Sequence, residues 1–328
     1  MTQTIFDVLQ ILDEVGIGNP VTGEVISERL GITRTAVWKN VNLLREIGYE
    51  IEASPKTGYA LKKRTRHLLP YEIKRYLKTQ TIGQEMYHFE KVSSTNALAR
   101  QMLHEVGDDV QPGTVLIAER QTEGTGRLNR IWMSPRGGIW ATIVVMPKLN
   151  VDQIFSIMMA GSLALTRTIR HEFGLSSLIK WPNDVFIGDK KVAGMTLELS
   201  ADEDILRYCL IGVGIDVNVS IEKTMPDIST IATSISDELE HDVDRAQFFA
   251  KFLKEFERRY QMVLRGETEP LFCEWRSLSY TLHRRIRIRT MKESFEGEAI
   301  DIDERGALLV HRDGGEIERV IAGDCFIL

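Results

Sequence analysis

The spacing of the apolar residues changes twice along the chain, and this limits the possible fold more than any other feature. Residues 4–15 place isoleucine, valine and leucine at helical spacing, and two further helical patterns follow Gly18-Asn-Pro20. Thr22 and Thr33 stand where the first turns of these two helices need a capping oxygen, and Gly31 separates them. Helix, short glycine turn, helix is the spacing of a helix-turn-helix.

The outer face of the third predicted helix carries side chains of the types that contact phosphates and base edges. They are Arg34, Thr35, Trp38, Lys39 and Asn42. Residues 48–61 then read as a two-stranded wing with its turn at residues 54–58. Basic residues gather on the third helix and the wing although the whole chain has a net charge of −6, so DNA binding is favoured. A winged helix that serves as a protein-binding or structural module is the alternative.

From about residue 68 the pattern changes to alternating strands and helices, and one loop between strands stands out. It joins the predicted strands 113–119 and 137–145. Its glycines lack a Cβ, so the backbone can take positive φ and approach a ligand closely. Its arginines are permanent, fork-shaped cations suited to phosphate or carboxylate, and its tryptophan offers a flat apolar face. The loop is therefore predicted to hold a nucleotide or another anion, with a hairpin turn bearing solvated arginines as the alternative. The residues concerned are Gly124, Gly126, Arg127, Arg130 and Trp132.

Polar residues interrupt two further apolar stretches. Residues 178–187 read as one strand, and a hairpin turn at Gly188-Asp189 leads to a second strand over residues 190–199. Polar groups inside buried strands need partners, and a ligand is one way to supply them. The residues concerned are Lys180, Asn183, Asp184 and Lys191. The cluster Ser93-Ser-Thr-Asn96 is expected to cap a helix, and it could also offer hydroxyl and N–H groups to a polar ligand.

The rest of the chain predicts two long helices and a final run of short strands. Asp152 is expected to cap the first helix, and the second runs from about Asp244 to Leu264. From His283 onwards the spacing predicts a small β-barrel or sandwich as a third domain. Its expected strands are 286–290, 295–302, 307–311 and 317–321.

Length and composition exclude several classes of protein. A chain of 328 residues is long for a single core, so two or three domains are expected. No basic segment followed by an apolar run stands at the N-terminus, and no stretch of about 18 apolar residues appears, so neither a signal peptide nor a membrane span is predicted. Cys209, Cys273 and Cys325 are few, odd in number and far apart. They favour a reducing, cytoplasmic location over a disulfide framework.

In their order and spacing, these motifs resemble a bifunctional biotin–protein ligase that doubles as the biotin operon repressor. The resemblance covers nearly the whole length. It rests on the winged helix, Ser94-Thr-Asn96, the loop 124–132, Lys180-Trp-Pro-Asn-Asp184, Lys191-Val-Ala-Gly194, Gly212-Val-Gly-Ile-Asp-Val-Asn218 and an SH3-like tail. It implies a multidomain α+β fold: a winged helix-turn-helix DNA-binding domain over residues 1–64, a mixed α/β ligase domain of the biotin/lipoate ligase type over 65–276, and an SH3-like β-barrel over 277–328.

The resemblance also implies a reaction and a set of site residues. Such enzymes use ATP and Mg²⁺ to convert biotin into biotinyl-5′-AMP, then pass the biotinyl group to a lysine of a biotin carboxyl carrier protein. Arg127 and Lys191 would be catalytic, and Asp184 would lie near the metal ion. Biotin would be bound by Ser94, Thr95, Asn96, Gln121, Gly124, Arg127, Lys191 and Gly194. ATP would be bound by Arg127, Arg130, Trp132, Asn183, Lys191 and Asp216. The implied partners are the carrier protein, operator DNA and, when the adenylate is bound, a second copy of the chain.

Two positions depart from the pattern of the family. Its loop commonly reads Gly-Arg-Gly-Arg, and Thr125 here removes one cation. Its late glycine strand often has asparagine where this chain has Asp216, and an ionised carboxylate cannot donate a hydrogen bond. Two other hypotheses remain. A ligand-sensing repressor without ligase activity is disfavoured by Arg127, Lys191 and Asn183. A lipoate ligase is disfavoured by the DNA-binding front end.

Overall fold

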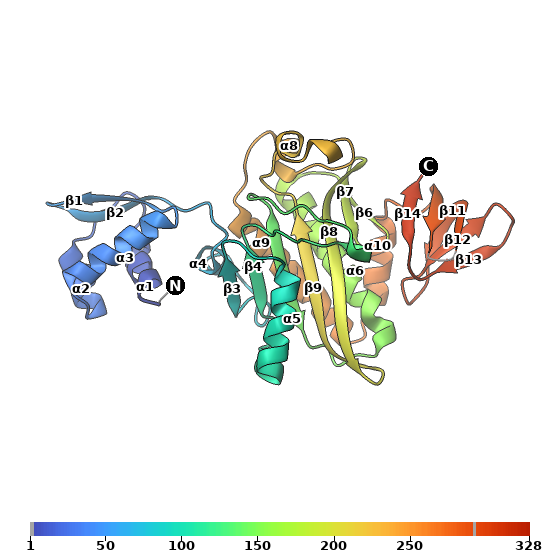
Figure 1. The fold of residues 1–328 in the computed structure, drawn as a ribbon, viewed down its shortest axis with the longest axis horizontal. Helices are drawn as coiled ribbons and strands as arrows, with labels where there is room; N and C mark the ends of the chain where they lie inside the picture. The colour runs from blue at the N-terminus through green and yellow to red at the C-terminus, as the bar shows by residue number, and fades with distance from the viewer. Residues whose placement is uncertain (1–2, 291–292) are drawn as a thin grey trace. The chain divides into compact units, whose positions relative to one another are not determined.

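The computed structural model describes residues 3–290 and 293–328, and the chain forms two compact units, Met1–Tyr71 and Glu72–Leu328. The first unit contains three helices, α1 (Gln3–Glu14), α2 (Gly23–Leu30) and α3 (Arg34–Glu46). An antiparallel pair follows, β1 (Glu50–Ser54) and β2 (Gly58–Lys63), as Figure 1 shows. This unit is the winged helix-turn-helix that the sequence predicts.

Local signals set the ends of these helices. The Thr22 side chain accepts a hydrogen bond from the Val25 N–H at 3.3 Å, and Thr33 accepts one from the Ala36 N–H at 3.1 Å. Gly31 ends α2 in the left-handed conformation, with φ 64°. Both predicted caps are therefore confirmed. The inner faces of the three helices close one apolar core that includes Val8, Leu9, Leu12, Ile26, Val37, Val41 and Leu44.

The second unit is built on a seven-stranded mixed sheet. Its strands are β3 (Met86–Phe89), β4 (Val115–Ala118), β5 (Ile139–Val145), β6 (Ser177–Lys180), β7 (Asp184–Ile187), β8 (Lys190–Asp202) and β9 (Ile205–Ile215). They lie in the order β3-β4-β5-β9-β8-β7-β6, and β3 pairs with β4 in parallel while the other pairs are antiparallel. The longest pair, β8 and β9, forms the middle of the sheet.

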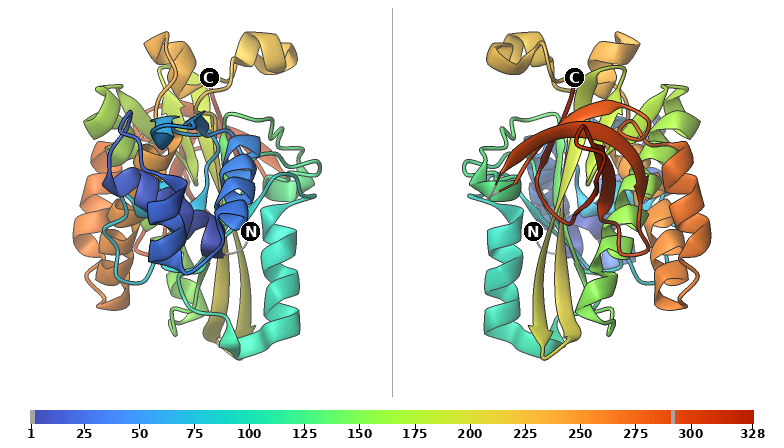
Figure 2. Two further views of the ribbon diagram at one scale, coloured as in Figure 1. Left: turned by 90° about the vertical axis from the view of Figure 1, so that its left-hand side faces the viewer. Right: turned by 90° about the vertical axis from the view of Figure 1, so that its right-hand side faces the viewer.

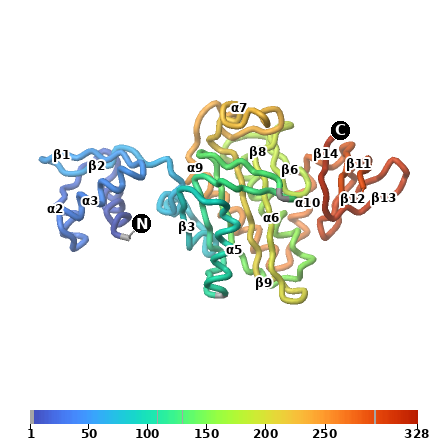
Figure 3. The backbone as a smooth tube through the Cα atoms, viewed as in Figure 1, coloured from blue at the N-terminus to red at the C-terminus, as the bar shows by residue number. Residues whose placement is uncertain are grey.

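Helices cover both faces of this sheet. On one face lies α5 (Thr95–Val106), whose Ala99 and Leu103 pack on Leu116, Val144 and Leu210. On the other face lie α6 (Ile154–Phe173), α9 (Arg245–Leu264) and α10 (Glu269–Ser277), as Figure 2 shows. The short α7 (Ile221–Thr224) and α8 (Ile235–Leu239) lie at one end of the sheet, on the path from β9 to α9 (Figure 3). The predicted helix 244–264 is confirmed, with Asp244 accepting from the Gln247 N–H.

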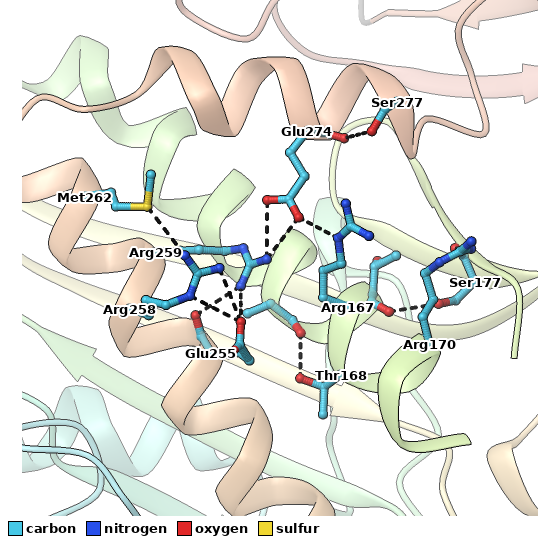
Figure 4. A network of polar contacts seen from close by, with 12 residues as sticks. Arg167, Thr168, Arg170, Ser177, Glu255, Arg258, Arg259, Met262, Glu274 and Ser277 are labelled. Atoms are coloured by element: carbon cyan, nitrogen blue, oxygen red, sulfur yellow. Dashed lines mark hydrogen bonds and ion pairs between the residues drawn. The ribbon is translucent and has the colours of Figure 1, made fainter. Parts of the chain in front are cut away.

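A polar network ties α6, α9 and α10 together (Figure 4). Arg259 on α9 is only 2% exposed, and it binds Glu274 of α10 at 3.0 Å and Glu255 one turn earlier. Arg167 of α6 reaches the same Glu274 at 2.5 Å. Because a buried guanidinium is costly without an anionic partner, Glu255 and Glu274 together stabilise Arg259 where the three helices meet.

The C-terminal segment forms a separate antiparallel sheet of five strands. They are β10 (Arg285–Arg289), β11 (Ser294–Ile302), β12 (Leu308–Arg312), β13 (Ile317–Val320) and β14 (Asp324–Ile327), in the order β13-β12-β11-β10-β14. The sheet is strongly curved (Figure 2). Sequence reasoning placed the first four strands and missed β14.

Two details of the predicted elements were wrong. The predicted cap of the long helix is wrong, because Asp152 lies inside a 3₁₀ turn, η3 (Val151–Gln153), that precedes α6. Asn150 and Gln153 form a capping box around this turn, and α6 itself begins after Gln153 without a side-chain cap. Residues 178–187 are not one strand, because residues 181–183 form a turn between β6 and β7, which pair with each other in antiparallel orientation. None of the helices in the described ranges has the length and apolar character needed to span a membrane.

Candidate functional site

The loop of residues 124–132, the glycine loop, is a short hairpin closed by its own backbone. The Trp132 N–H donates to the Gly124 carbonyl at 2.8 Å, and the Gly126 N–H donates to the Arg130 carbonyl at 2.8 Å. Gly124 and Gly126 can take positive φ, but neither does, and the residue of the loop with positive φ is Leu128, at 55°. Gly124 is required for another reason, since a Cβ there would meet the Trp132 carbonyl at 2.4 Å. The backbone of the loop is therefore a hairpin turn, as the alternative hypothesis for this loop proposed.

The arginines of the glycine loop are not simply solvated. Arg127 is partly buried and donates to the Asn183 Oδ1 at 3.4 Å and to the Gly323 carbonyl at 3.1 Å. Burial lowers the pKa of Arg127, while the carboxylates of Asp184 and Asp324 oppose that shift. Arg130 is more exposed and pairs with Asp324. The start of β14, which the sequence did not predict, therefore binds both cations, through Gly323 just before the strand and Asp324 as its first residue.

A cavity of about 620 Å³ opens beside this loop. Its volume lies in the range of small-molecule sites. The predicted ligand-binding residues that line it are Ser94, Thr95, Asn96, Gln121, Arg127, Arg130, Trp132, Asn183, Asp184, Lys191, Gly194 and Asp216. Gly124 is not among the lining residues, although it packs against Gln121 and Ser134 at the base of the loop. The structure thus brings together residues from five separate parts of the sequence.

One end of the cavity is a hydrogen-bonded polar network. The backbone N–H and the hydroxyl of Thr95 both donate to Gln121 Oε1, at 2.8 and 3.1 Å. The Thr142 hydroxyl lies 2.8 Å from that of Thr95 and 2.5 Å from Asn96 Oδ1. Ser94 precedes α5 at the N-cap position, but its side chain does not cap the helix as expected. These groups are suited to a small ligand with several polar atoms at one end.

The centre of the cavity carries the charged groups. Lys191 pairs with Asp184 at 2.7 Å, and its ammonium lies 4.9 Å from the centre of the Trp132 ring. Gly194 leaves the room that this pair occupies, since a Cβ there would lie 3.1 Å from the Lys191 Nζ. Asn183 is buried and donates to the Met195 carbonyl. Two cations, Arg127 and Lys191, therefore face one cavity that a polyanion can enter.

The other end of the cavity is mainly apolar. Met225, Ile228 and Ala232, from the segment between β9 and α8, form its wall together with Trp132. The tryptophan ring lies over Gly214, where a Cβ would be only 2.5 Å from its Nε1. A flat ring over a glycine strand, facing an apolar wall, is a suitable slot for an aromatic base. Sequence reasoning did not identify this wall, because its residues carry no distinguishing pattern.

Asp216 is a buried polar residue at this apolar end. It is 4% exposed, and its Oδ1 has no hydrogen-bond partner among the described residues. Burial raises the pKa of Asp216 to about 8, with Lys191 opposing the shift and Asp237 adding to it. The carboxyl is therefore largely neutral near pH 7.

In the first unit, the residues predicted to contact DNA lie on one helix. Arg34, Thr35, Trp38 and Lys39 are exposed on α3, and Trp38 is 53% exposed, which is unusual for an indole. Asn42 is half-buried and accepts from Arg45 at 3.1 Å. Arg34 pairs with Glu24 of α2. This helix presents an outward polar and aromatic face, as the sequence predicts.

Comparisons with known proteins agree with this geometry. Residues 89–216 match the model of the biotin/lipoate A/B protein ligase family. Residues 6–60 match an HTH domain, and residues 281–328 match the biotin protein ligase C-terminal domain. The three matches coincide with the winged helix, the cavity-bearing sheet and the C-terminal sheet.

Two named relatives match this chain over nearly its whole length. The bifunctional ligase/repressor BirA of Bacillus subtilis is 34% identical over 320 residues, which is 97% of this chain and 97% of the relative. The bifunctional ligase/repressor BirA of Escherichia coli is 24% identical over 307 residues, 93% of this chain and 92% of the relative. Among solved structures, the Aquifex aeolicus biotin protein ligase in complex with biotin and ATP has a TM-score of 0.64 and 26% identity, and it covers 75% of this chain and 99% of its own.

Proposed function

The chain belongs to the family of biotin–protein ligases that also act as repressors, and we propose how its own residues divide that work. It is an ATP-dependent ligase that activates biotin and transfers it to a carrier protein, and its helix-turn-helix domain fits a repressor. The observation that carries this conclusion is 34% identity over 97% of both chains, combined with a cavity that gathers the expected residues.

The reaction has two steps, and neither requires a nucleophile from the protein. A carboxylate oxygen of biotin attacks the α-phosphorus of ATP, and pyrophosphate leaves with the electrons of the broken P–O bond. The amine of the acceptor lysine then attacks the carbonyl of the mixed anhydride and loses a proton, and AMP leaves. The first step joins two anions, so the chain must mainly position them and offset negative charge.

The polar end of the cavity fits the head of biotin. Thr95 and Thr142 hold the Gln121 and Asn96 side chains in fixed orientations, which leaves a preorganised set of donors and acceptors around Ser94. Such a network favours a ligand with a compact polar group, because its members need no reorganisation on binding. We assign the ureido group of biotin to this end.

The two central cations then lie where the reacting anions meet. Arg127 is partly buried, so its attraction to a carboxylate or α-phosphate is less screened than that of a surface arginine. Lys191 is held by Asp184 and by the Trp132 ring, which fixes the direction of its ammonium. The nucleotide base lies in the apolar slot beside Trp132, with Arg130 and Asn183 towards the phosphates.

Mg²⁺ is the metal ion that the family implies, and Asp184 fits it. Magnesium is commonly bound by one or two carboxylates together with phosphate oxygens, and Asp184 is a partly exposed carboxylate that lines the cavity. Within the described residues, no three or more His, Cys, Asp or Glu side chains are grouped as metal ligands. We propose that the ion enters with the nucleotide. When bound, it offsets phosphate charge.

Each of the two units suggests a different partner. We propose that α3 contacts operator DNA, that a carrier-protein lysine reaches the cavity, and that adenylate binding favours a homodimer. We also place the chain in the cytoplasm, supported by three free cysteines of which Cys209 and Cys325 are buried.

Competition between two acids tests the substrate. The full chain is incubated with ATP, Mg²⁺, an acceptor carrier domain and equal concentrations of biotin and lipoate, and the carrier is weighed by mass spectrometry. Addition of biotin alone is expected. Addition of lipoate, or of neither acid, would contradict the proposal.

A further inference from the structure

The carboxyl of Asp216 is a buried polar group that lines the apolar end of the cavity. Its backbone is fixed from both sides, because its N–H donates to the Val192 carbonyl at 3.0 Å and its carbonyl accepts from the Ile235 N–H at 3.0 Å. Its side chain lines the cavity, and Oδ1 is buried without a partner among the described residues. A buried polar atom of this kind favours a ligand that completes its hydrogen bonds.

The surroundings of this carboxyl disfavour its charge. Met225 and Ala232 are buried in the apolar cluster beside it, and the Trp132 ring lines the same end. The charged groups that face it are Lys191 from β8 and Asp237 from α8, and Asp237 is held in place by the Ile221 N–H at 3.0 Å. Burial outweighs the lysine and raises the pKa of Asp216 to about 8.

The protonation state of a carboxyl decides which nucleic-acid base it matches. A neutral carboxyl offers one donor and one acceptor side by side, whereas an ionised carboxylate offers two acceptors. Adenine presents a ring-nitrogen acceptor beside an amino donor, which pairs with the neutral form. Guanine presents two donors, N1–H and the 2-amino group, which pair with the ionised form.

We propose that Asp216 selects adenine as a neutral carboxylic acid, donating its proton to a ring nitrogen and accepting a hydrogen bond from the exocyclic amino group. This inference rests on the proposed function, because it assigns the base of ATP to the slot between Trp132 and the apolar wall. It makes nucleotide choice depend on pH. Ionisation of Asp216 removes the donor that adenine needs and creates the pair of acceptors that guanine needs.

The test compares two nucleotides at two pH values, using the full chain. Biotin-dependent pyrophosphate release gives kcat/KM for ATP and for GTP at about pH 7 and about pH 9. The ratio of the two values cancels the effects of pH on groups that do not contact the base. Because the neutral fraction of a group with a pKa of about 8 falls about tenfold over this interval, the ATP/GTP ratio should fall at least about tenfold.

Asp216→Asn is the matched variant. Its amide presents one donor and one acceptor at every pH, so its ATP/GTP ratio should stay constant between the two pH values. A wild-type ratio that does not change with pH would overturn the inference, and so would an equal fall in D216N. The wild-type result alone decides the question if the variant does not fold. Absence of any biotin-dependent pyrophosphate release with ATP at pH 7 would instead reject the proposed function.

Discussion

Replacing Asp216 by asparagine is expected to stabilise the folded chain, and the gain should grow with pH. In the unfolded chain the carboxyl titrates near its ordinary pKa of 3.8, whereas burial raises the pKa to about 8 in the fold. Because the folded pKa is the higher one, the favourable contribution is complete below pH 3.8 and is lost progressively as the pH rises towards 8. The loss is up to about 1.4 kcal/mol per pH unit, or about 4 kcal/mol at pH 7.

Chemical denaturation at a series of pH values between about 5 and 8 measures this difference. Four of the five tryptophans, Trp132, Trp140, Trp181 and Trp275, lie in the unit that contains Asp216, so the fluorescence mainly reports that unit. The stability of D216N minus that of the wild type should increase steadily across the series. Asp227→Asn is the control, because Asp227 lines the same cavity but is exposed, and it should change stability by less than about 0.5 kcal/mol. A D216N difference that is constant or decreasing with pH would refute the reasoning.

Four further predictions test other parts of the molecule. Lys191→Met should lower the rate of biotin-dependent pyrophosphate release by about 100- to 1000-fold, since it removes a cation from the reacting phosphate; an unchanged rate would exclude that role. Gly214→Ala should displace the tryptophan ring that lies 2.5 Å from its new Cβ and lower kcat/KM for ATP by about 10- to 100-fold, while equal kcat/KM would place the base elsewhere. Glu274→Gln should cost about 2 kcal/mol in denaturant unfolding, because Arg259 is 2% exposed and keeps Glu255 as its remaining anion. Lys39→Ala should reduce the slope of log K against log salt for operator DNA by about 1, and an unchanged slope would remove this lysine from the phosphate contacts.

The parts of the fold that depend on local signals could be predicted from the sequence. Thr22 and Thr33 cap their helices with their own hydroxyls, and Gly31 supplies the left-handed turn between them. Each of these effects acts within three or four residues, so a pattern in the sequence is enough to reveal it.

The parts that depend on distant partners could not be predicted. The β14 strand begins at Asp324, and its alternation over four residues is too short to distinguish it from a loop. Its importance comes from the Arg127 and Arg130 contacts, nearly 200 positions earlier in the chain. Asp152 does not cap α6, because a 3₁₀ turn with its own capping residue, Asn150, precedes the helix. The sequence does not distinguish this turn from the first turn of the helix.

The candidate site shows the same difference between features with a local signal in the sequence and features that depend on distant residues. Lys191 and Asp184 could be selected from the sequence, because charged residues are unusual inside apolar strands. In the structure they form an ion pair of 2.7 Å in the cavity. That Ser94 and Gln121 belong to the same site was predicted from the family resemblance and not from the spacing of the residues. Thr142 was missed, because a threonine in an apolar strand is ordinary until its neighbours on α5 are known.

The ligase assignment depends most directly on whether the chain makes and holds biotinyl-5′-AMP. The purified full chain is titrated calorimetrically with biotin, with and without ATP and Mg²⁺, and the complex is then examined by native mass spectrometry. We predict a bound species with the mass of biotinyl-5′-AMP, formed only when both substrates are present and lost on addition of the carrier domain. Biotin that binds but is never adenylated would contradict the ligase assignment, and a chain that binds no biotin would contradict the whole account.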